Sequence, residues 1–140
     1  METIQKWYKK TKFNPYDENA WFYLGLACLK YCQVGIPDEL NTTNYLKQSE
    51  KAFLHVLSTN PERTDAYLKL SEIYFENSEY NRAIENINKY LFFSPNDNKG
   101  YILKCEILFQ QKKIKQLREF LKQKETTDRD KLHSLKTVWT

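Results

Sequence analysis

The chain of 140 residues is poor in the residues that break helices, with 3 glycines and 4 prolines. Turn-rich β-sandwiches and β-barrels need many more of both, so an all-β fold is not expected. The glycine-rich phosphate-binding motifs GxGxxG and GxxxxGKS/T do not occur. The sequence also lacks an uncharged apolar run near the roughly 18–20 residues of a membrane span. These absences predict a helical protein, which we place in the cytoplasm because no secretory signal opens the chain.

Cysteine and histidine are also scarce: the chain has Cys28, Cys32 and Cys105, with His55 and His133. An odd number of cysteines without a CxxC pair favours free thiols in a reducing compartment over a disulfide framework or a zinc site. The sequence contains no HExxH or GxSxG motif and no set of nucleophile, base and orienting residue. We therefore expect no enzymatic activity, no metal site and no cofactor.

Aromatic residues are abundant, at 15% of the chain, and several follow a repeat that the prolines mark. Pro61 and Pro95 are 34 residues apart, and Pro15 precedes Pro61 by 46 residues, which is 34 plus an insertion of 12. An aromatic residue follows each of these prolines by six positions: Trp21, Tyr67 and Tyr101. Within residues 64–77, and again within 80–93, apolar residues recur with the period of an α-helix. The repeated unit is therefore a helix, a short turn, a second helix and a proline.

This unit resembles the tetratricopeptide repeat (TPR), whose 34-residue pattern is W-x2-L-G-x2-Y, then A-x3-F, then P. The resemblance extends over about residues 14–125. The residues at the pattern positions are Trp21, Leu24, Gly25, Cys28, Ser49, Phe53 and Pro61 in the first unit, Tyr67, Leu70, Ser71, Tyr74, Ala83, Ile87 and Pro95 in the second, and Tyr101, Lys104, Cys105, Leu117 and Arg129 in the third. The third unit is degenerate, because Lys104 and Leu117 replace the usual leucine and alanine.

The resemblance implies an all-α fold, a right-handed superhelical stack of antiparallel helix pairs. In the family, small residues at the positions of Gly25 and Ala83 let the two helices of a pair approach closely. We expect eight helices in a single domain: a leader helix, three pairs and a capping helix that covers the open end of the stack. The boundaries are 1–13 for the leader helix, 14–63, 64–97 and 98–126 for the three repeats, and 127–140 for the capping helix. Thr127 and Asp130 resemble a capping box at the start of this last helix. The apolar residues of the capping helix are Leu132, Leu135, Val138 and Trp139.

The 12 extra residues lie within the first repeat, between its two helices. This segment, residues 33–44, contains Gly35, Pro37, Asn41 and Asn44, so we expect a loop or a short turn there. Two interpretations remain open: a surface insertion that the fold tolerates and a loop that takes part in binding.

The resemblance also implies a function, because the first helices of TPR pairs line a concave groove that docks a segment of a partner protein. We therefore expect a protein–protein interaction module, an adaptor or scaffold. Carried over by position, the groove residues are Asn19, Phe22, Leu26, Leu29, Lys30, Asp65, Leu68, Glu72, Phe75, Glu76, Lys99, Ile102, Glu106 and Phe109. Among these, apolar residues form a ladder with Phe22, Leu68 and Ile102 at one level and Leu29, Phe75 and Phe109 at another. Because Glu72 and Glu106 lie at the centre, the expected partner segment is apolar and carries a basic residue.

The sequence also bears on other kinds of partner. The carboxylate clamp of chaperone-binding TPR proteins is not expected, because only Lys99 fits among the matching positions Phe22, Leu26, Lys69, Lys99 and Leu103. Residues 112–140 carry nine basic and four acidic groups, net +5, so RNA or an anionic lipid is an alternative partner of the C-terminal helix. A further alternative is homo-oligomerisation, in which the terminal helix with Trp139 pairs with a second copy.

Overall fold

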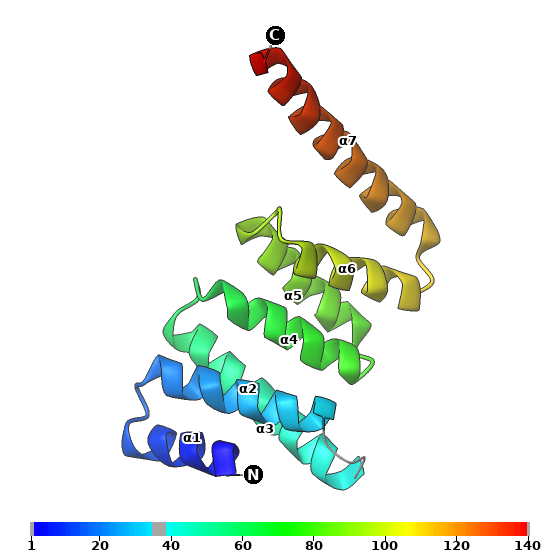
Figure 1. Cartoon of the computed structure of the whole chain (residues 1–140). Helices are drawn as coiled ribbons and strands as arrows, with labels where there is room; N and C mark the ends of the chain where they lie inside the picture. The colour runs from blue at the N-terminus through cyan, green and yellow to red at the C-terminus, as the bar shows by residue number, and fades with distance from the viewer. Residues whose placement is uncertain (1, 35–38, 140) are drawn as a thin grey trace.

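A computed structural model describes residues 2–34 and 39–139, with the side chains of residues 3–34 and 41–129. This part of the chain is helical and contains no strand, which confirms the all-α expectation. The helices are α1 (Glu2–Phe13), α2 (Glu18–Val34), α3 (Glu39–Thr59), α4 (Thr64–Glu76), α5 (Tyr80–Phe93), α6 (Asn98–Gln110) and α7 (Ile114–Trp139) (Figure 1). None of these helices is long and apolar enough to cross a membrane.

The helices stack as antiparallel pairs in two layers. In Figure 1, α2, α4 and α6 lie side by side in one layer, with α3 and α5 behind them. The first two pairs, α2 with α3 and α4 with α5, make the most extensive contacts in the molecule. α1 packs on α2 as α3 packs on α4 and α5 on α6, so α1 has the place of the second helix of an incomplete pair. This arrangement confirms the predicted stack of helix pairs.

Each of the three repeat prolines lies in a turn of the same kind, which explains the constant spacing between the proline and the following helix. The backbone N–H of Asp17 donates to the carbonyl of Asn14 at 3.2 Å, and Arg63 and Asp97 donate in the same way to Asn60 and Ser94. Each turn therefore closes over four residues with proline second, where its fixed φ suits a β-turn. The chain reverses at these points and the next first helix begins.

The aromatic residue six positions after the proline also has a structural reason. The Trp21 Nε1–H donates to the carbonyl of Pro15 at 2.9 Å, and the Tyr67 hydroxyl donates to the carbonyl of Pro61 at 2.8 Å. A large side chain with a hydrogen-bond donor spans the first turn of the helix and ties it to the preceding β-turn. In the third unit, Tyr101 instead stacks on Phe120 of α7, with ring centroids 4.8 Å apart.

Small residues and buried serines hold each of the first two pairs together. The carbonyl of Gly25 on α2 accepts a hydrogen bond from the Ser49 hydroxyl on α3 at 2.7 Å. In the next pair the positions are exchanged, because the Ser71 hydroxyl on α4 donates to the carbonyl of Ala83 on α5 at 2.8 Å. Both serines are fully buried, and a hydrogen bond satisfies each hydroxyl there.

We predict that Gly25→Ala lowers the free energy of unfolding by about 1–3 kcal/mol, the usual penalty of overpacking. A Cβ atom on Gly25 would lie 2.8 Å from the ring of Phe53, which is fully buried. Denaturant unfolding of Gly25→Ala, Phe53→Leu and the double variant measures the coupling between the two positions. Gly25→Ala should reduce the stability less when Phe53 is replaced by leucine. Additive losses in the double variant would contradict the close contact.

The predicted loop 33–44 is wrong at both ends. Gln33 and Val34 are the last residues of α2, and residues 39–44 form the start of α3. Gly35 and Pro37, on which the loop was predicted, lie outside the described residues. The two helices of the first pair are therefore longer than a standard TPR unit requires.

Packing between the extensions explains why residues 39–44 are helical despite their asparagines. The rings of Tyr31 on α2 and Tyr45 on α3 meet edge to face, with centroids 4.6 Å apart. The Cys32 thiol lies 3.4 Å from the carbonyl of Thr42 and donates to it. These tertiary contacts override the weak helix propensity of the insertion.

The predicted boundary between the third repeat and a capping helix at residue 127 is also wrong, because α7 is one helix. Thr127 lies in its interior and its hydroxyl donates to the carbonyl of Gln123 at 2.9 Å. An ion pair of 2.7 Å between Arg129 and Glu125 has the i,i+4 spacing that supports a helix. Seven helices, not eight, therefore occur in residues 2–34 and 39–139.

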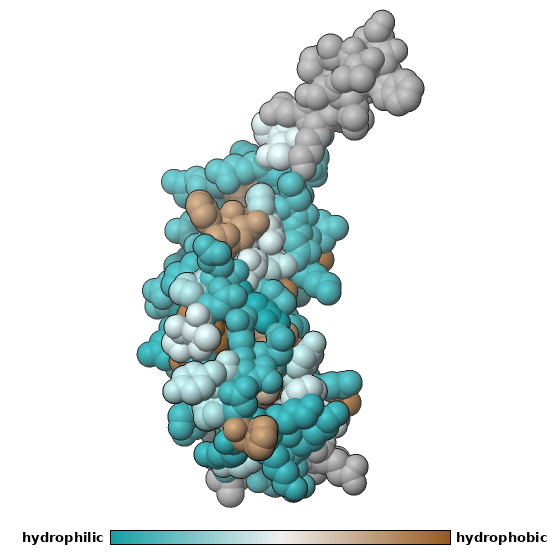
Figure 2. Space-filling model, turned by 90° about the vertical axis from the view of Figure 1, so that its left-hand side faces the viewer, coloured by the Kyte–Doolittle hydropathy of each residue, from teal (hydrophilic) through white to brown (hydrophobic). Residues whose placement is uncertain are grey.

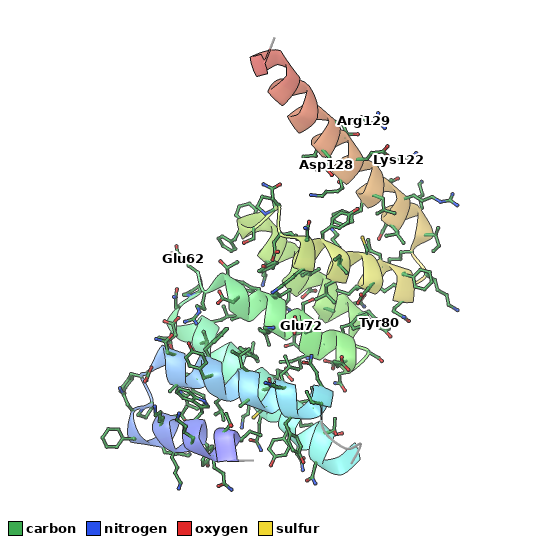
Figure 3. All side chains as sticks on the ribbon, viewed as in Figure 1. Glu62, Glu72, Tyr80, Lys122, Asp128 and Arg129 are labelled. Atoms are coloured by element: carbon green, nitrogen blue, oxygen red, sulfur yellow. The ribbon has the colours of Figure 1, made fainter. Side chains whose placement is uncertain are left out.

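α7 diverges from α6 instead of covering the end of the stack. Figures 1 and 3 show its C-terminal part, including Asp128 and Arg129, clear of the other helices. The third unit has Leu117 where the second has the fully buried Ala83, a larger side chain at the position where small residues let paired helices approach closely. The side chains of the predicted apolar cap lie outside those described: Leu132, Leu135, Val138 and Trp139.

Exposed apolar residues are dispersed on the side of the molecule drawn in Figure 2. Hydrophobic residues form small separate patches there, surrounded by hydrophilic ones. Over the whole described surface, the most exposed large apolar side chains are Phe13 at 94%, Tyr16 at 88% and Phe92 at 82%. Figure 2 therefore shows no continuous apolar face of the kind that marks a permanent interface.

Candidate functional site

A hollow of about 350 Å³ lies between α4 and α6, close to the end of α2. We call it the α4/α6 hollow. Its lining is Gln33, Glu72, Phe75, Glu76, Lys99, Ile102, Leu103 and Glu106. Six of the fourteen predicted groove residues are among these eight. The structure therefore brings together six of the nine predicted residues of the second and third units.

Helical spacing places these side chains on facing surfaces. On α4, Glu72, Phe75 and Glu76 have the spacing i, i+3, i+4, which is one face of a helix. On α6 the lining residues recur with the same period, from Lys99 to Glu106. Figure 3 shows Glu72 near the middle of α4, on the face formed by α2, α4 and α6.

The surroundings of Glu72 change the pKa of its carboxyl. Burial raises the pKa of its carboxyl, and the Lys69 ammonium, 3.4 Å from Oε2, acts against this increase. Lys99 lowers the pKa of Glu72 in the same way, and the neighbouring Glu76 adds to the increase. The environment therefore disfavours the ionised form of Glu72 in spite of two ammonium groups nearby.

The lining carries a net negative charge. Glu72, Glu76 and Glu106 contribute −3 and Lys99 contributes +1, which gives −2 for the eight residues. Among the residues that the structure describes, Glu76 and Glu106 have no ion-pair partner. The hollow is therefore complementary to a cation, with Glu72 as its partly buried carboxylate.

Apolar surface lies beside these carboxylates. Ile102 is 54% exposed, so its side chain is open to contact with a ligand. Phe75 is partly buried and its ring meets that of Tyr80 edge to face, with centroids 5.9 Å apart. Leu103 is buried. The site thus combines acidic groups with an open apolar contact.

The predicted apolar ladder is not an open surface in the first unit or at Leu68 of the second. Phe22, Leu29 and Leu68 are only 6%, 2% and 7% exposed, respectively, and belong to the hydrophobic core. This part of the predicted groove is wrong, because these side chains fill the space between neighbouring pairs. Of the six predicted ladder residues, Ile102 and Phe109 are exposed and Phe75 is partly so.

Arg63, which no sequence pattern had indicated, covers the ring of Phe22 in the first unit. Its guanidinium carbon lies 4.2 Å from the ring centroid of Phe22. Its Nη1 donates to Glu18 at 2.9 Å and to the Asn19 side chain at 3.0 Å. Two predicted groove residues, Asn19 and Phe22, are therefore occupied by contacts within the chain.

The remaining predicted groove residues lie apart from the hollow. Leu26 packs against the core. Lys30 and Asp65 are exposed but do not line the hollow, and Asp65 lies 3.8 Å from the Arg63 guanidinium. Phe109 is 61% exposed near the end of α6 and also lies outside the lining.

Two lining residues, Gln33 and Leu103, were not among the predicted site residues. Gln33 was assigned to a loop, and it reaches the hollow because α2 continues to Val34. Leu103 follows Ile102 directly and has the i+4 spacing from Lys99. A count of helical positions from Lys99 would have found Leu103, whereas no local signal indicates the extra turn of α2.

The three cysteines are free thiols. Burial, together with the nearby Cys32, raises the pKa of Cys28 to about 12. Burial also raises the pKa of Cys32 and of Cys105, and both are partly exposed.

We predict that Cys28 resists alkylation by N-ethylmaleimide at pH 8, reacting at least ~10-fold more slowly than the other two cysteines, because thiolate and access are both needed. Peptide mass spectrometry after timed quenching reports each rate. Cys28→Ser should remove only the slow fraction. Equal rates at all three thiols in the folded protein would contradict the burial of Cys28.

The fold is similar to those of solved TPR structures. The crystal structure of the MamA protein matches with a TM-score of 0.72 and 18% identity, covering 85% of this chain and 58% of that one. A thermophilic TPR protein of Thermus thermophilus matches with a TM-score of 0.70 and 13% identity, covering 84% of this chain and 59% of that one. The chain thus spans under two thirds of either structure. No protein-family model and no curated protein matches it. At these identities the likeness concerns the fold, and it confirms the predicted TPR-like helical repeat.

Proposed function

We propose that the α4/α6 hollow docks a segment of a partner protein in which a basic side chain is flanked by apolar ones. The TPR-like fold is a helical scaffold of the kind that binds other proteins, which supports an interaction module in general. The observation that carries the finer proposal is the partly buried carboxylate of Glu72, within a lining of net charge −2, beside the exposed Ile102.

A basic side chain would enter between α4 and α6. Its charge would meet Glu72, and Glu76 and Glu106 would attract it without first breaking an ion pair. A cation there would also lower the unfavourable free energy of ionised Glu72. Apolar neighbours on the same segment would cover Ile102 and Phe75, which supplies the hydrophobic contribution.

The positions of the lysines argue against an anionic partner in this hollow. Lys69 already contacts Glu72, and Phe22 and Leu26 have no group that binds a carboxylate. Lys99 is the single ammonium of the lining. The absence of a carboxylate clamp accordingly stays a prediction, and these contacts support it.

A display library of nine-residue peptides tests the proposal, with Ile102→Asn and the control Leu54→Asn. Leu54 is 46% exposed on α3, away from the hollow, so its substitution matches the change without touching the site. We expect enrichment of peptides with one Arg or Lys between apolar residues, and about tenfold weaker binding to Ile102→Asn alone. Enrichment of acidic peptides, or equal binding to both variants, would refute the proposal.

The alternative functions expected for the C-terminal helix, binding of RNA or anionic lipid and pairing of two copies, remain predictions. The lysines and arginine between residues 112 and 122, in the turn before α7 and in its first part, are exposed. Nearby groups partner some charges of α7, such as Lys124 with Asp128 at 3.7 Å. RNA or anionic lipid binding and pairing of two copies therefore rest on the sequence pattern alone.

A further inference from the structure

A second and larger hollow, of about 620 Å³, lies on the other layer of the stack. We call it the α1/α3 hollow. It is bounded by α1 and α3 and has α2 at its base. Its lining is Ile4, Gln5, Tyr8, Lys9, Lys12, Trp21, Leu24, Tyr45, Gln48, Lys51 and His55. It shares no residue with the α4/α6 hollow.

The hollow opens between α1 and α3, which are spaced apart on α2. Both helices pack on α2 but not on each other. Between α3 and α5, the equivalent space is crossed by Tyr74 of α4, whose hydroxyl lies 3.1 Å from Glu50 and whose ring lies under Arg82. The repeat position of Tyr74 is occupied in α2 by Cys28, which is too short to reach between α1 and α3. The tyrosine of the second repeat therefore has no counterpart between α1 and α3, where the buried Cys28 thiol lies 4.0 Å from Gln48 at the hollow's edge.

The electrostatic character of this hollow is positive. Lys9 and Lys12 approach from α1, and Lys51 and His55 from α3, so basic groups stand on both sides. The other seven lining residues include no carboxylate. With three ammonium groups and no acidic group, the lining has a charge of +3 with histidine neutral. The hollow therefore attracts an anion by the same reasoning that assigns a cation to the α4/α6 hollow.

Aromatic side chains give the hollow a fixed apolar surface. The Trp21 indole is held by its hydrogen bond to the Pro15 carbonyl and by the His55 ring, whose centroid is 4.2 Å away. The His55 Nε2 lies 3.2 Å from the same carbonyl and donates to it, because a carbonyl can only accept. Tyr8 is 49% exposed at the edge. A ligand with an apolar body thus finds a preformed surface.

We infer that the α1/α3 hollow binds an acidic helical segment of a partner protein, with an apolar side chain placed on Trp21 and Tyr8. α1 and α3 run in the same direction, since each is antiparallel to α2, and they form the two walls of a groove. A helix with acidic residues along both edges of an apolar stripe fits such a groove, with its carboxylates toward Lys9 and Lys12 on one side and Lys51 on the other. The protein would then bind a basic segment on one layer and an acidic one on the other.

The test uses the full chain and a synthetic 15-residue helical peptide with Glu along both edges of a Leu/Phe stripe. A second peptide has Lys in place of every Glu. Fluorescence anisotropy compares the wild type with Lys9→Glu/Lys51→Glu. The control is Lys115→Glu/Lys122→Glu on α7, which changes the net charge equally and lies outside both hollows. All four lysines are exposed, so far-UV circular dichroism should be unchanged.

The acidic peptide is expected to bind the wild type and the control equally, and the Lys9→Glu/Lys51→Glu variant about tenfold more weakly. Tyr8→Ala should weaken binding about threefold, because it removes apolar contact without a charge. Equal loss in both double variants would mean attraction by net charge alone and would overturn the inference. So would failure of the acidic peptide to bind the wild type, or tighter binding of the lysine peptide at this hollow.

Discussion

Phe53→Ala is expected to lower the free energy of unfolding by about 3–5 kcal/mol, the usual effect of removing a buried phenylalanine. Phe53 is fully buried, its ring lies against the backbone of Gly25, and it meets Phe22 edge to face with centroids 5.4 Å apart. It therefore joins α3 to α2, and α2 in turn carries α1. Small domains are stable by about 5–15 kcal/mol, so this substitution removes a large part of the total.

Guanidinium denaturation followed by circular dichroism measures the effect. Phe92→Ala is the matched control, because Phe92 is 82% exposed and its removal should change the stability by less than about 0.5 kcal/mol. The Phe53 variant should show a lower midpoint at an unchanged slope. Equal midpoints for the two variants would show that the α2–α3 contact does not carry the stability assigned to it.

Glu72→Gln is expected to weaken binding of a basic segment about 30-fold, which corresponds to the roughly 2 kcal/mol lost when one partner of a desolvated charge pair is removed. The same substitution should make the free protein more stable at neutral pH. The pKa of Glu72 is raised by burial, so the folded state binds its proton more tightly than the unfolded state. The stability contributed by protonated Glu72 is present at low pH and is lost as the pH rises through the raised pKa.

The free energy of unfolding, measured as a function of pH, tests this prediction. The stabilisation by glutamine should be present above the raised pKa of Glu72 and should vanish below the ordinary value of 4.5, where the native carboxyl is also neutral. Glu85→Gln, at an exposed position of α5, should change neither stability nor binding. If the Glu72→Gln protein is less stable at pH 7 and binds normally, the role of Glu72 is limited to its ion pair with Lys69.

The regular part of the fold could be predicted from the sequence because local patterns encode it. The prolines at 15, 61 and 95 mark turns that close over four residues, and two of the three following aromatics hydrogen-bond to the proline carbonyls. Both features depend on residues close together in the chain. The exchange of roles between Ser49 and Ser71 was not predicted, because it depends on which helix of each pair carries the hydroxyl.

The errors have a common cause, which is that local signals were outweighed by the surrounding structure. The insertion was predicted as a loop from Gly35 and Pro37, but packing of Tyr31 on Tyr45 supports a longer α3 that includes residues 39–44. The break at Thr127 was predicted from a local motif that lies in the interior of α7.

The candidate site could be predicted only in part, because transfer by repeat position treats every unit alike. It identified Glu72 and Ile102, which do line a hollow. It also selected Phe22, which is covered by Arg63 from the turn that precedes α4. The α1/α3 hollow was not predicted, although Cys28 at the position of Tyr74 is the signal that would have indicated it.

The central claim is that the α4/α6 hollow recognises a basic side chain through its carboxylates, and a charge exchange tests it most directly. The dissociation constant of the best library peptide and of its Arg→Glu counterpart is measured for the wild type and for Glu72→Lys/Glu106→Lys. Glu85→Lys/Glu119→Lys, which lies outside the hollow, is the control. We predict that the hollow variant loses the arginine peptide and gains the glutamate peptide, while the control behaves as the wild type. Unchanged preference in the hollow variant, or the same exchange in the control, would contradict the claim.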